Sequence, residues 1–303
     1  MADSLVAPLR IVNPGGTYKR LPTYSPDMKP LGIVGPTRAE TSALVDRLAA
    51  ALAERGRVGT IRHLADAPET DDDDVAGLRD SASHAETVYG LADDGKWIAS
   101  GEENSLDDAL AALAPDHEYV LVEGFADASI PKVTLGDRAY AGEAILSATD
   151  AAAVDIDRVL DRLDAVEPFE TLSSLVASVK HSPDADRSGA IATFTGRVRA
   201  RDDPDDAPTQ HLTFEKYDGV ADERMARIRE ELAAREGVQD VRLHHRTGVI
   251  EYGEDIVFVV VLAGHREEAF ETVRDGINRL KAEVPLFKKE VTVEEEFWVH
   301  DRP

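Results

Sequence analysis

The sequence predicts two domains of different class, an α/β domain with a parallel sheet followed by an α+β domain with a mostly antiparallel sheet. Three observations predict this arrangement. The chain has 303 residues, which is more than one domain usually contains. In its first half, short apolar strands alternate with helical sequence, as in βαβ units. From Pro168 onward, strands come in pairs between amphipathic helices.

The elements of the first domain follow from apolar runs and from the period of apolar residues. In order they are a strand at 30–36, a helix at 39–55, and strands at 58–63 and 119–125. The four consecutive aspartates at 71–74 predict a solvated loop.

The domain limits follow from changes in composition. Residues 28–140 carry the parallel-sheet pattern, and 168–303 carry the α+β pattern. Residues 141–167 are rich in alanine and aspartate, so we expect a linker with a short helix at 155–164. Residues 1–27, rich in proline, glycine and tyrosine, are expected to be a disordered arm or a mis-assigned start.

The same criteria, applied to the sequence of the second domain, predict three helices and several strands. In order these are a helix at 169–180, strands at 189–198 and 210–217, a helix at 220–236, strands at 238–247 and 255–263, a helix at 266–283, and two short strands to the end.

Charge and composition exclude several classes of protein. With 59 acidic against 34 basic residues, the net charge of -25 argues against a nucleic-acid binder and against attraction to anionic membranes. Such a surface is typical of a halophilic protein in a salt-rich cytoplasm, and an acidic mesophilic protein remains an alternative. The chain has no cysteine, which excludes disulfides and thiolate metal sites. It shows neither a signal peptide nor a membrane-spanning run, so we expect a cytoplasmic protein without a metal site.

Three of the nine lysines lie between Lys281 and Lys289, which we call the lysine window. A lysine amine, unlike an arginine, can lose its proton. Two close ammonium groups at Lys281 and Lys288 would disfavour each other's charge, and a neutral amine is a nucleophile or base. The other interpretation is that these cations only complement the dipole of the helix that ends before Pro285.

Further cations are predicted to join the lysine window. Gly264-His265-Arg266 begins the same helix, and helix N-termini favour anions. Arg197 and Arg199 alternate along a strand and therefore face the same side, where guanidinium groups suit a phosphate. Each has a plainer interpretation: His265 as a helix cap, and Arg199 with Arg201 as partners of nearby aspartates. Together they predict a cationic pocket.

The turn from Gly35 to Ser42 lies where a P-loop belongs, between the first strand and the first helix. A P-loop requires a second glycine and a lysine where this chain has Glu40 and Thr41. The helix N-terminus still favours an anion, and Ser42 could meet Mg²⁺. We therefore expect no tightly bound cofactor, regard GTP and Mg²⁺ binding as doubtful, and favour a scaffold over an active kinase or GTPase.

Four motifs stand in order in the first domain: Gly32-Ile-Val-Gly-Pro36, Thr60-Ile-Arg-His63, Leu121-Val-Glu-Gly-Phe125 and Ile130-Pro-Lys132. Over about residues 28–138 they resemble MobB, the guanine-nucleotide-binding adaptor family of molybdenum-cofactor biosynthesis. The turn before the first helix departs from that family's pattern.

The second domain carries Phe194-Thr-Gly-Arg-Val-Arg199, Leu243-His-His-Arg-Thr-Gly248, Gly264-His-Arg266, Lys281-x-x-x-Pro-x-x-Lys288-Lys-Glu290 and Phe297-Trp-Val299. In this order they resemble the MoaE family, the catalytic large subunit of molybdopterin synthase, over about residues 168–303. The resemblance implies a hammerhead-like α+β fold. The aspartate-rich loop after Arg199 departs from the family.

The resemblance to MoaE also implies a reaction. The family converts cyclic pyranopterin monophosphate (precursor Z) to molybdopterin, using sulfur from the C-terminal Gly-Gly thiocarboxylate of a small ubiquitin-like partner. It forms a central homodimer with pockets near the subunit boundary, which implies that some ligands can come from the neighbouring chain. By position, Lys281 would be the main catalytic residue and Lys288 its helper. The substrate-binding set would be Arg197, Val198, Arg199, His265, Arg266, Lys281, Lys288, Lys289 and Glu290. The neighbouring His244 and His245 must face opposite sides of a strand and are expected to be structural. A non-catalytic adaptor that binds phosphate ligands is the alternative function.

Overall fold

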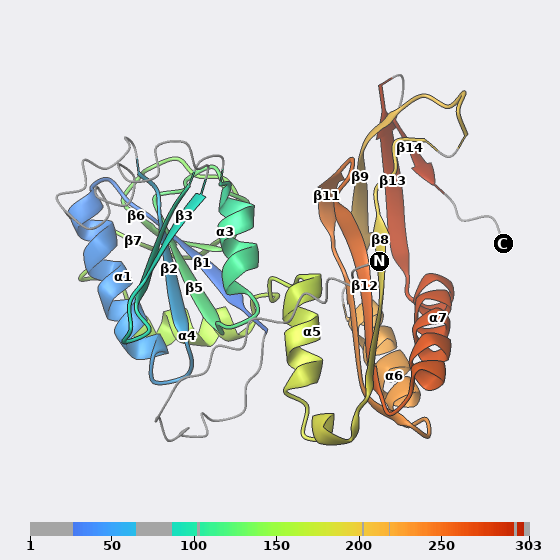
Figure 1. Ribbon diagram of the computed structural model, residues 1–303. Helices are drawn as coiled ribbons and strands as arrows, with labels where there is room; N and C mark the ends of the chain where they lie inside the picture. The colour runs from blue at the N-terminus through green and yellow to red at the C-terminus, as the bar shows by residue number, and fades with distance from the viewer. Residues whose placement is uncertain are drawn as a thin grey trace.

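The computed structural model describes residues 27–64, 87–101, 104–201, 203–217, 219–293 and 296–299 (Figure 1). The arm or mis-assigned start predicted for the first 27 residues lies almost wholly outside this range. The loop predicted at 71–74 also lies outside it.

The first domain is built on a five-stranded sheet in which every pair is parallel. Its strand order is β2-β5-β1-β6-β7. The strands are β1 (Lys29–Val34), β2 (Val58–Arg62), β5 (Tyr119–Glu123), β6 (Lys132–Leu135) and β7 (Ala144–Ala148). A separate hairpin is formed by β3 (Thr87–Leu91) and β4 (Trp97–Gly101). The parallel sheet confirms the predicted α/β class.

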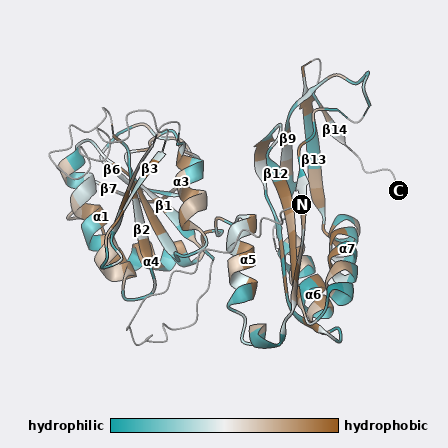
Figure 2. Cartoon of the chain, viewed as in Figure 1, coloured by the Kyte–Doolittle hydropathy of each residue, from teal (hydrophilic) through white to brown (hydrophobic). Residues whose placement is uncertain are grey.

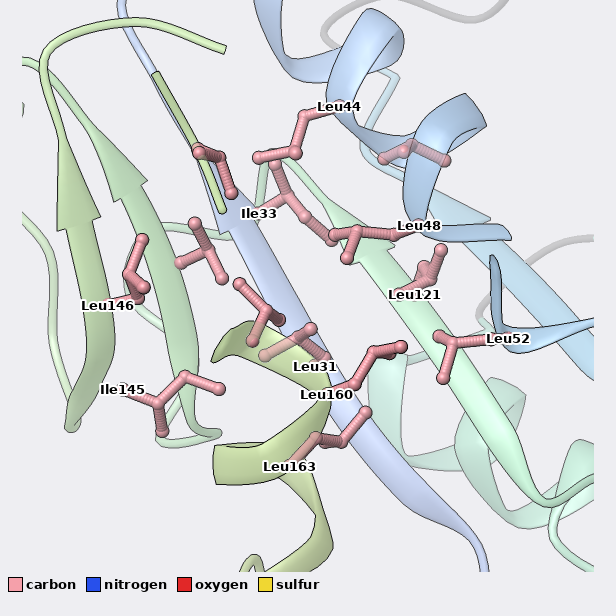
Figure 3. Close-up of a cluster of buried hydrophobic side chains, with 14 of the residues drawn as sticks. Leu31, Ile33, Leu44, Leu48, Leu52, Leu121, Ile145, Leu146, Leu160 and Leu163 are labelled. Carbon is pink, nitrogen blue, oxygen red and sulfur yellow. The ribbon is translucent and has the colours of Figure 1, made fainter. Parts of the chain in front are cut away.

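Helices cover both faces of this sheet, because alternate strand residues point to opposite sides. The helices are α1 (Arg38–Leu52), α3 (Leu106–Leu113) and α4 (Ile156–Asp164). On one face, Leu31 and Leu121 pack with Leu48 of α1 and Leu160 of α4 (Figure 3). On the other face, strand β5 packs against α3. The sheet is therefore buried on both sides, as parallel sheets usually are.

Residues 141–167 are not a linker, so this prediction was wrong. Strand β7 extends the parallel sheet by pairing with β6. Helix α4 buries Val159, Leu160 and Leu163 against the core. The short helix predicted at 155–164 is confirmed as α4. The alanine- and aspartate-rich composition concealed the strand and the packing of the helix, because only a few apolar side chains on one face are needed to hold a strand or helix at the edge of a core.

The second domain contains two antiparallel sheets, of order β10-β12-β8 and β11-β9-β13-β14. The first sheet comprises β8 (Ala190–Arg197), β10 (Val238–His245) and β12 (Asp255–Ala263). The second comprises β9 (Thr209–Lys216), β11 (Gly248–Glu251), β13 (Leu286–Thr292) and β14 (Glu296–Val299), and it extends beyond the helices (Figure 1). The α+β class and the antiparallel pairing are confirmed.

Helices cover both faces of the three-stranded sheet, because alternate residues of β12 point to opposite sides of it. Val257, Val259 and Val261 face α6 (Val220–Ala233) and α7 (Arg266–Glu283). Phe258 and Val260 face α5 (Leu172–Lys180). Figure 2 shows hydrophobic residues along these strands and hydrophilic residues on the outer sides of the helices. Among the described residues, no helix combines the length and apolar character needed to cross a membrane.

Candidate functional site

The lysine window begins in the last turn of α7 and continues into β13. Val284 ends the helix in an extended conformation (φ -88°, ψ 121°), as expected for the residue before Pro285. Lys281 is exposed on the last helical turn. Lys288 lies on β13, whose partner strand β9 carries Phe214 opposite it. The break at the proline therefore places one lysine on a helix and the other on a sheet.

The three lysines differ in their partners. The Nζ of Lys288 lies 3.8 Å from Oε2 of Glu290, two residues along the same strand face. The Nζ of Lys289, on the opposite face, lies 2.9 Å from a carboxylate oxygen of Glu296. Within the described residues, the side chain of Lys281 makes no hydrogen bond or ion pair. Lys281 is therefore the amine of the window whose side chain is not committed to another group.

The segment Arg197-Val198-Arg199 lies at the same end of the domain as Lys288. Val198 is buried in a small cluster with Phe214, the residue opposite Lys288. Arg197 donates from Nε and Nη2 to the carbonyl oxygen of Gly253 at 3.2 and 2.7 Å. Both arginines are exposed, on either side of the buried valine. Their guanidinium groups can thus reach the surface near the lysine window.

His265 and Arg266 lie at the opposite end of α7, so one chain does not bring them together with Lys281. Arg266 and Lys281 are fifteen residues apart on α7, which corresponds to about 22 Å at 1.5 Å per residue. Strand β8 gives the same separation. Its start is fixed by a hydrogen bond from Gly189 N to Gly264 O, and Arg197 follows eight residues later at about 26 Å at 3.2–3.4 Å per residue. Sequence motifs do not reveal this separation, because it depends on how the helix lies along the sheet.

Two hollows of the surface lie away from the lysine window. One, of about 360 Å³, is lined by residues such as Lys180, Ser188 and Gly189. The other, of about 490 Å³, lies between α1 and α4 beside Arg47 and Asp157. Neither hollow is lined by a residue of the lysine window, in which Lys281 is exposed and Lys288 and Lys289 are half-buried.

The turn at the start of α1 is occupied by the chain's own groups. Thr37 caps the helix, and its hydroxyl accepts from Glu40 N at 3.3 Å and donates to the Glu40 carboxylate at 2.9 Å. Thr41 stands where a P-loop has its lysine and donates to Oε1 of Glu123 at 2.6 Å. Ser42 donates to the same oxygen at 2.7 Å. The backbone oxygen of Gly35 accepts from Arg138 at 3.2 Å.

Glu123 at the end of β5 is the centre of this cluster. Burial opposes its ionisation, but hydrogen bonds from Thr41, Ser42 and Arg62 outweigh burial and lower the pKa of Glu123. Arg62 Nε lies 2.6 Å from Oε2. Both carboxylate oxygens are thus engaged by donors within the chain, and the position at which a P-loop has its lysine is occupied by Thr41. These residues do not fit a Mg²⁺-nucleotide.

His244 and His245 are held within the second domain. Burial lowers the pKa of each to about 4, so both are neutral near pH 7. The Nδ1 of His245 lies 2.7 Å from Arg246 O, and its ring packs edge-on against Phe214 at 4.7 Å. His244 stacks on Phe258. This environment agrees with the structural role expected for both.

Two polar residues were not recognised as candidates from the sequence. Glu123 ends a buried strand that lies next to the strand leading into the P-loop-like turn. That position in the sequence was the signal that could have identified Glu123 as a candidate. Lys132 is fully buried. Its Nζ donates to the carbonyl oxygens of Ala128, Ile130 and Ala141, which holds the connection between β5 and β6 in place.

The chain is 50% identical over 275 residues to the probable molybdopterin synthase of Haloferax volcanii, covering 91% of this chain and all of that protein. This chain belongs to the molybdopterin synthase family. The MoaE protein family model matches residues 166–283, and the model for molybdopterin guanine dinucleotide synthesis protein B (MobB) matches 31–156. Both resemblances read from the sequence are confirmed.

Further molybdopterin synthases match less than half of this chain. The molybdopterin synthase catalytic subunit of Pyrococcus abyssi is 41% identical over 112 residues, covering 37% of this chain and 74% of that protein. The crystal structure of molybdopterin synthase from Staphylococcus aureus is 26% identical and covers 45% of this chain and 93% of that chain, with a TM-score of 0.39.

Proposed function

We propose that this molybdopterin synthase transfers sulfur to precursor Z to form the dithiolene of molybdopterin, with Lys281 as its principal catalytic group. The observation that carries the proposal is the arrangement of the lysine window. Among the described residues, the amine of Lys281 at the helix end has no side-chain partner, while Lys288 on β13 lies 3.8 Å from Glu290 of the same strand. An uncommitted amine can act as nucleophile or base, and a held ammonium can stabilise developing negative charge.

The substrate's phosphate would be bound by the remaining cations. Arg197 and Arg199 flank a buried valine beside Lys288, and arginine binds phosphate through two parallel hydrogen bonds. Lys289 and Glu290 follow Lys288 on the same strand, β13, and border the proposed phosphate site. In this proposal neither a metal nor a tightly bound cofactor takes part, because cationic side chains supply the charge that a phosphate requires.

The sulfur must come from outside the chain, which has no cysteine. We propose that it arrives as the C-terminal thiocarboxylate of a small ubiquitin-like subunit of the MoaD type. Lys281 is exposed, so its amine can be approached from solvent by an extended Gly-Gly tail.

We further propose that His265 and Arg266 serve the site of a neighbouring copy in a homodimer. They lie about 22 Å from Lys281 along α7, too far to bind the same phosphate within one chain. A two-fold axis can bring the N-terminal end of one α7 near the C-terminal end of the other.

The test is synthesis of molybdopterin from precursor Z and the thiocarboxylated partner, at the salt concentration that an acidic surface favours. Lys281→Ala is expected to lower the rate by at least ~100-fold, the usual effect of removing a positioned acid–base group. Lys96→Ala, at an exposed lysine of the first domain, is the matched control. Activity of Lys281→Ala equal to that of the control would refute the proposed role.

For the first domain we propose an adaptor or scaffold role without nucleotide hydrolysis. Its support is the engagement of Glu123 by Arg62 and two hydroxyl groups. A titration with Mg²⁺-GTP at matched salt should show no binding. Saturable binding that Glu123→Gln abolishes would overturn this proposal.

A further inference from the structure

Thr209 lies where three functional segments meet. It begins β9, is 6% exposed, and is placed opposite Thr292 of β13. Its N–H donates to the carbonyl oxygen of Ala200 at 2.8 Å, which closes the base of the aspartate-rich loop directly after Arg199. Its backbone therefore joins the arginine segment to the sheet that carries the lysine window.

The side chain of Thr209 makes a second connection. Its hydroxyl donates to Oε1 of Glu290. The other carboxylate oxygen, Oε2, lies 3.8 Å from Nζ of Lys288. Each oxygen of Glu290 thus has one partner, a neutral donor on one side and the ammonium of Lys288 on the other.

The burial of these groups increases along the chain of contacts. The side chain of Lys288 is 35% exposed, that of Glu290 is 22% exposed, and Thr209 is buried. A carboxylate on a strand can rotate about its side-chain bonds, and holding one oxygen by a buried hydroxyl restricts the direction of the other. The hydrogen bond from Thr209 therefore limits where Glu290 can hold the lysine.

We propose that Thr209 is a positioning residue of the synthase, which orients Glu290 so that Glu290 holds the Lys288 ammonium beside Arg197 and Arg199. Glu290 then acts on the reaction through Lys288 and not as a ligand of the substrate. The inference rests on the proposed function, because it assigns to Lys288 a place at the reacting atoms.

The register explains why this position takes a threonine. A shift between Val291 and Thr292 interrupts the pairing of β13 with β9 next to Thr209. Thr209 is paired with Thr292, and its hydroxyl nevertheless reaches Glu290, two residues away along β13. A β-branched residue with a hydroxyl fits the strand and also supplies the donor.

The test compares Thr209→Val, which keeps the shape and removes the hydroxyl, with Thr209→Ser, which keeps the hydroxyl. The backbone bond to Ala200 is retained in both. Hydrogen bonds to charged groups contribute enough to predict a loss of turnover of about tenfold for valine. Serine should recover most of that loss. Thr213→Val, on the same strand, is the control and should leave the rate unchanged.

A double-mutant cycle with Glu290→Gln separates positioning from a structural effect. Glu290→Gln should lower turnover about as much as Thr209→Val, and adding Thr209→Val to it should cause no further loss. Thermal unfolding of each variant establishes that it is folded. If Thr209→Val does not fold, Glu290→Gln still tests the chain, since wild-type turnover in that variant overturns the proposal.

Three other results would contradict the positioning role of Thr209 without contradicting the proposed function. Turnover of Thr209→Val within twofold of the wild type, additive losses in the cycle, or failure of serine to restore the rate would overturn the role of Thr209 while leaving the synthase activity in place. Failure of the wild type to make molybdopterin would instead overturn the proposed function and, with it, this inference.

Discussion

Complementation between two inactive variants tests whether the active site is shared by two copies of the chain. One variant carries Lys281→Ala and the other carries His265→Ala with Arg266→Ala. Because these groups are separated by about 22 Å along α7, one chain does not supply both to the same substrate. In a mixed dimer, one site would lose all of these groups and the other would keep all of them.

The expected magnitude follows from this geometry. Each variant alone places a lesion in both sites and should be inactive. Mixed dimers, co-expressed with two different tags and purified through both, should have about half the molybdopterin-forming rate of the wild type, since one of two equivalent sites is intact.

A matched control uses two lesions at the same end of one chain. Mixed dimers of Lys281→Ala with Lys288→Ala have one lesion in every site and should stay inactive. If the first mixture is as inactive as the control, the two ends of α7 do not serve a common site. That result would refute the proposal that His265 and Arg266 act in the site of the neighbouring copy.

Two further predictions concern stability. Lys132→Met should lower the free energy of unfolding by about 3 kcal/mol or more, because three backbone carbonyls lose their donor. Urea unfolding measures this change. In the same measurement the exposed control Lys96→Met should lower the free energy of unfolding by less than ~0.5 kcal/mol. Burial raises the pKa of Glu170 to about 8, so its neutral form stabilises the fold below the unfolded value and this contribution is lost as pH rises through 8. Relative to Glu170→Gln, the wild type should therefore lose roughly 3–5 kcal/mol between pH 4 and pH 9 in unfolding curves; equal pH dependence of the two proteins would contradict the assignment.

Local patterns were sufficient for most of the elements. Helix α7 runs from Arg266 to Glu283 as predicted, since its apolar period is regular and Pro285 defines its end. Strand β7 and the packing of α4 were missed, because their apolar residues are few and become informative only beside the sheet that they cover. The hairpin of β3 and β4 was also missed.

The candidate site likewise has features that local sequence predicts and features that only packing determines. Sequence motifs were enough to identify the two families and the residue types of the site, because a lysine pair across a proline and paired arginines are local features. Which of these residues share one end of the domain depends on the tertiary structure. Helix α7 runs back along β12, so residues adjacent to its two ends are separated by its whole length, and a distance of that kind depends on packing and not on motif spacing. The contact from Thr209 to Glu290 and the engagement of Glu123 by Arg62 likewise join residues far apart in the chain, and only the folded sheets bring them together.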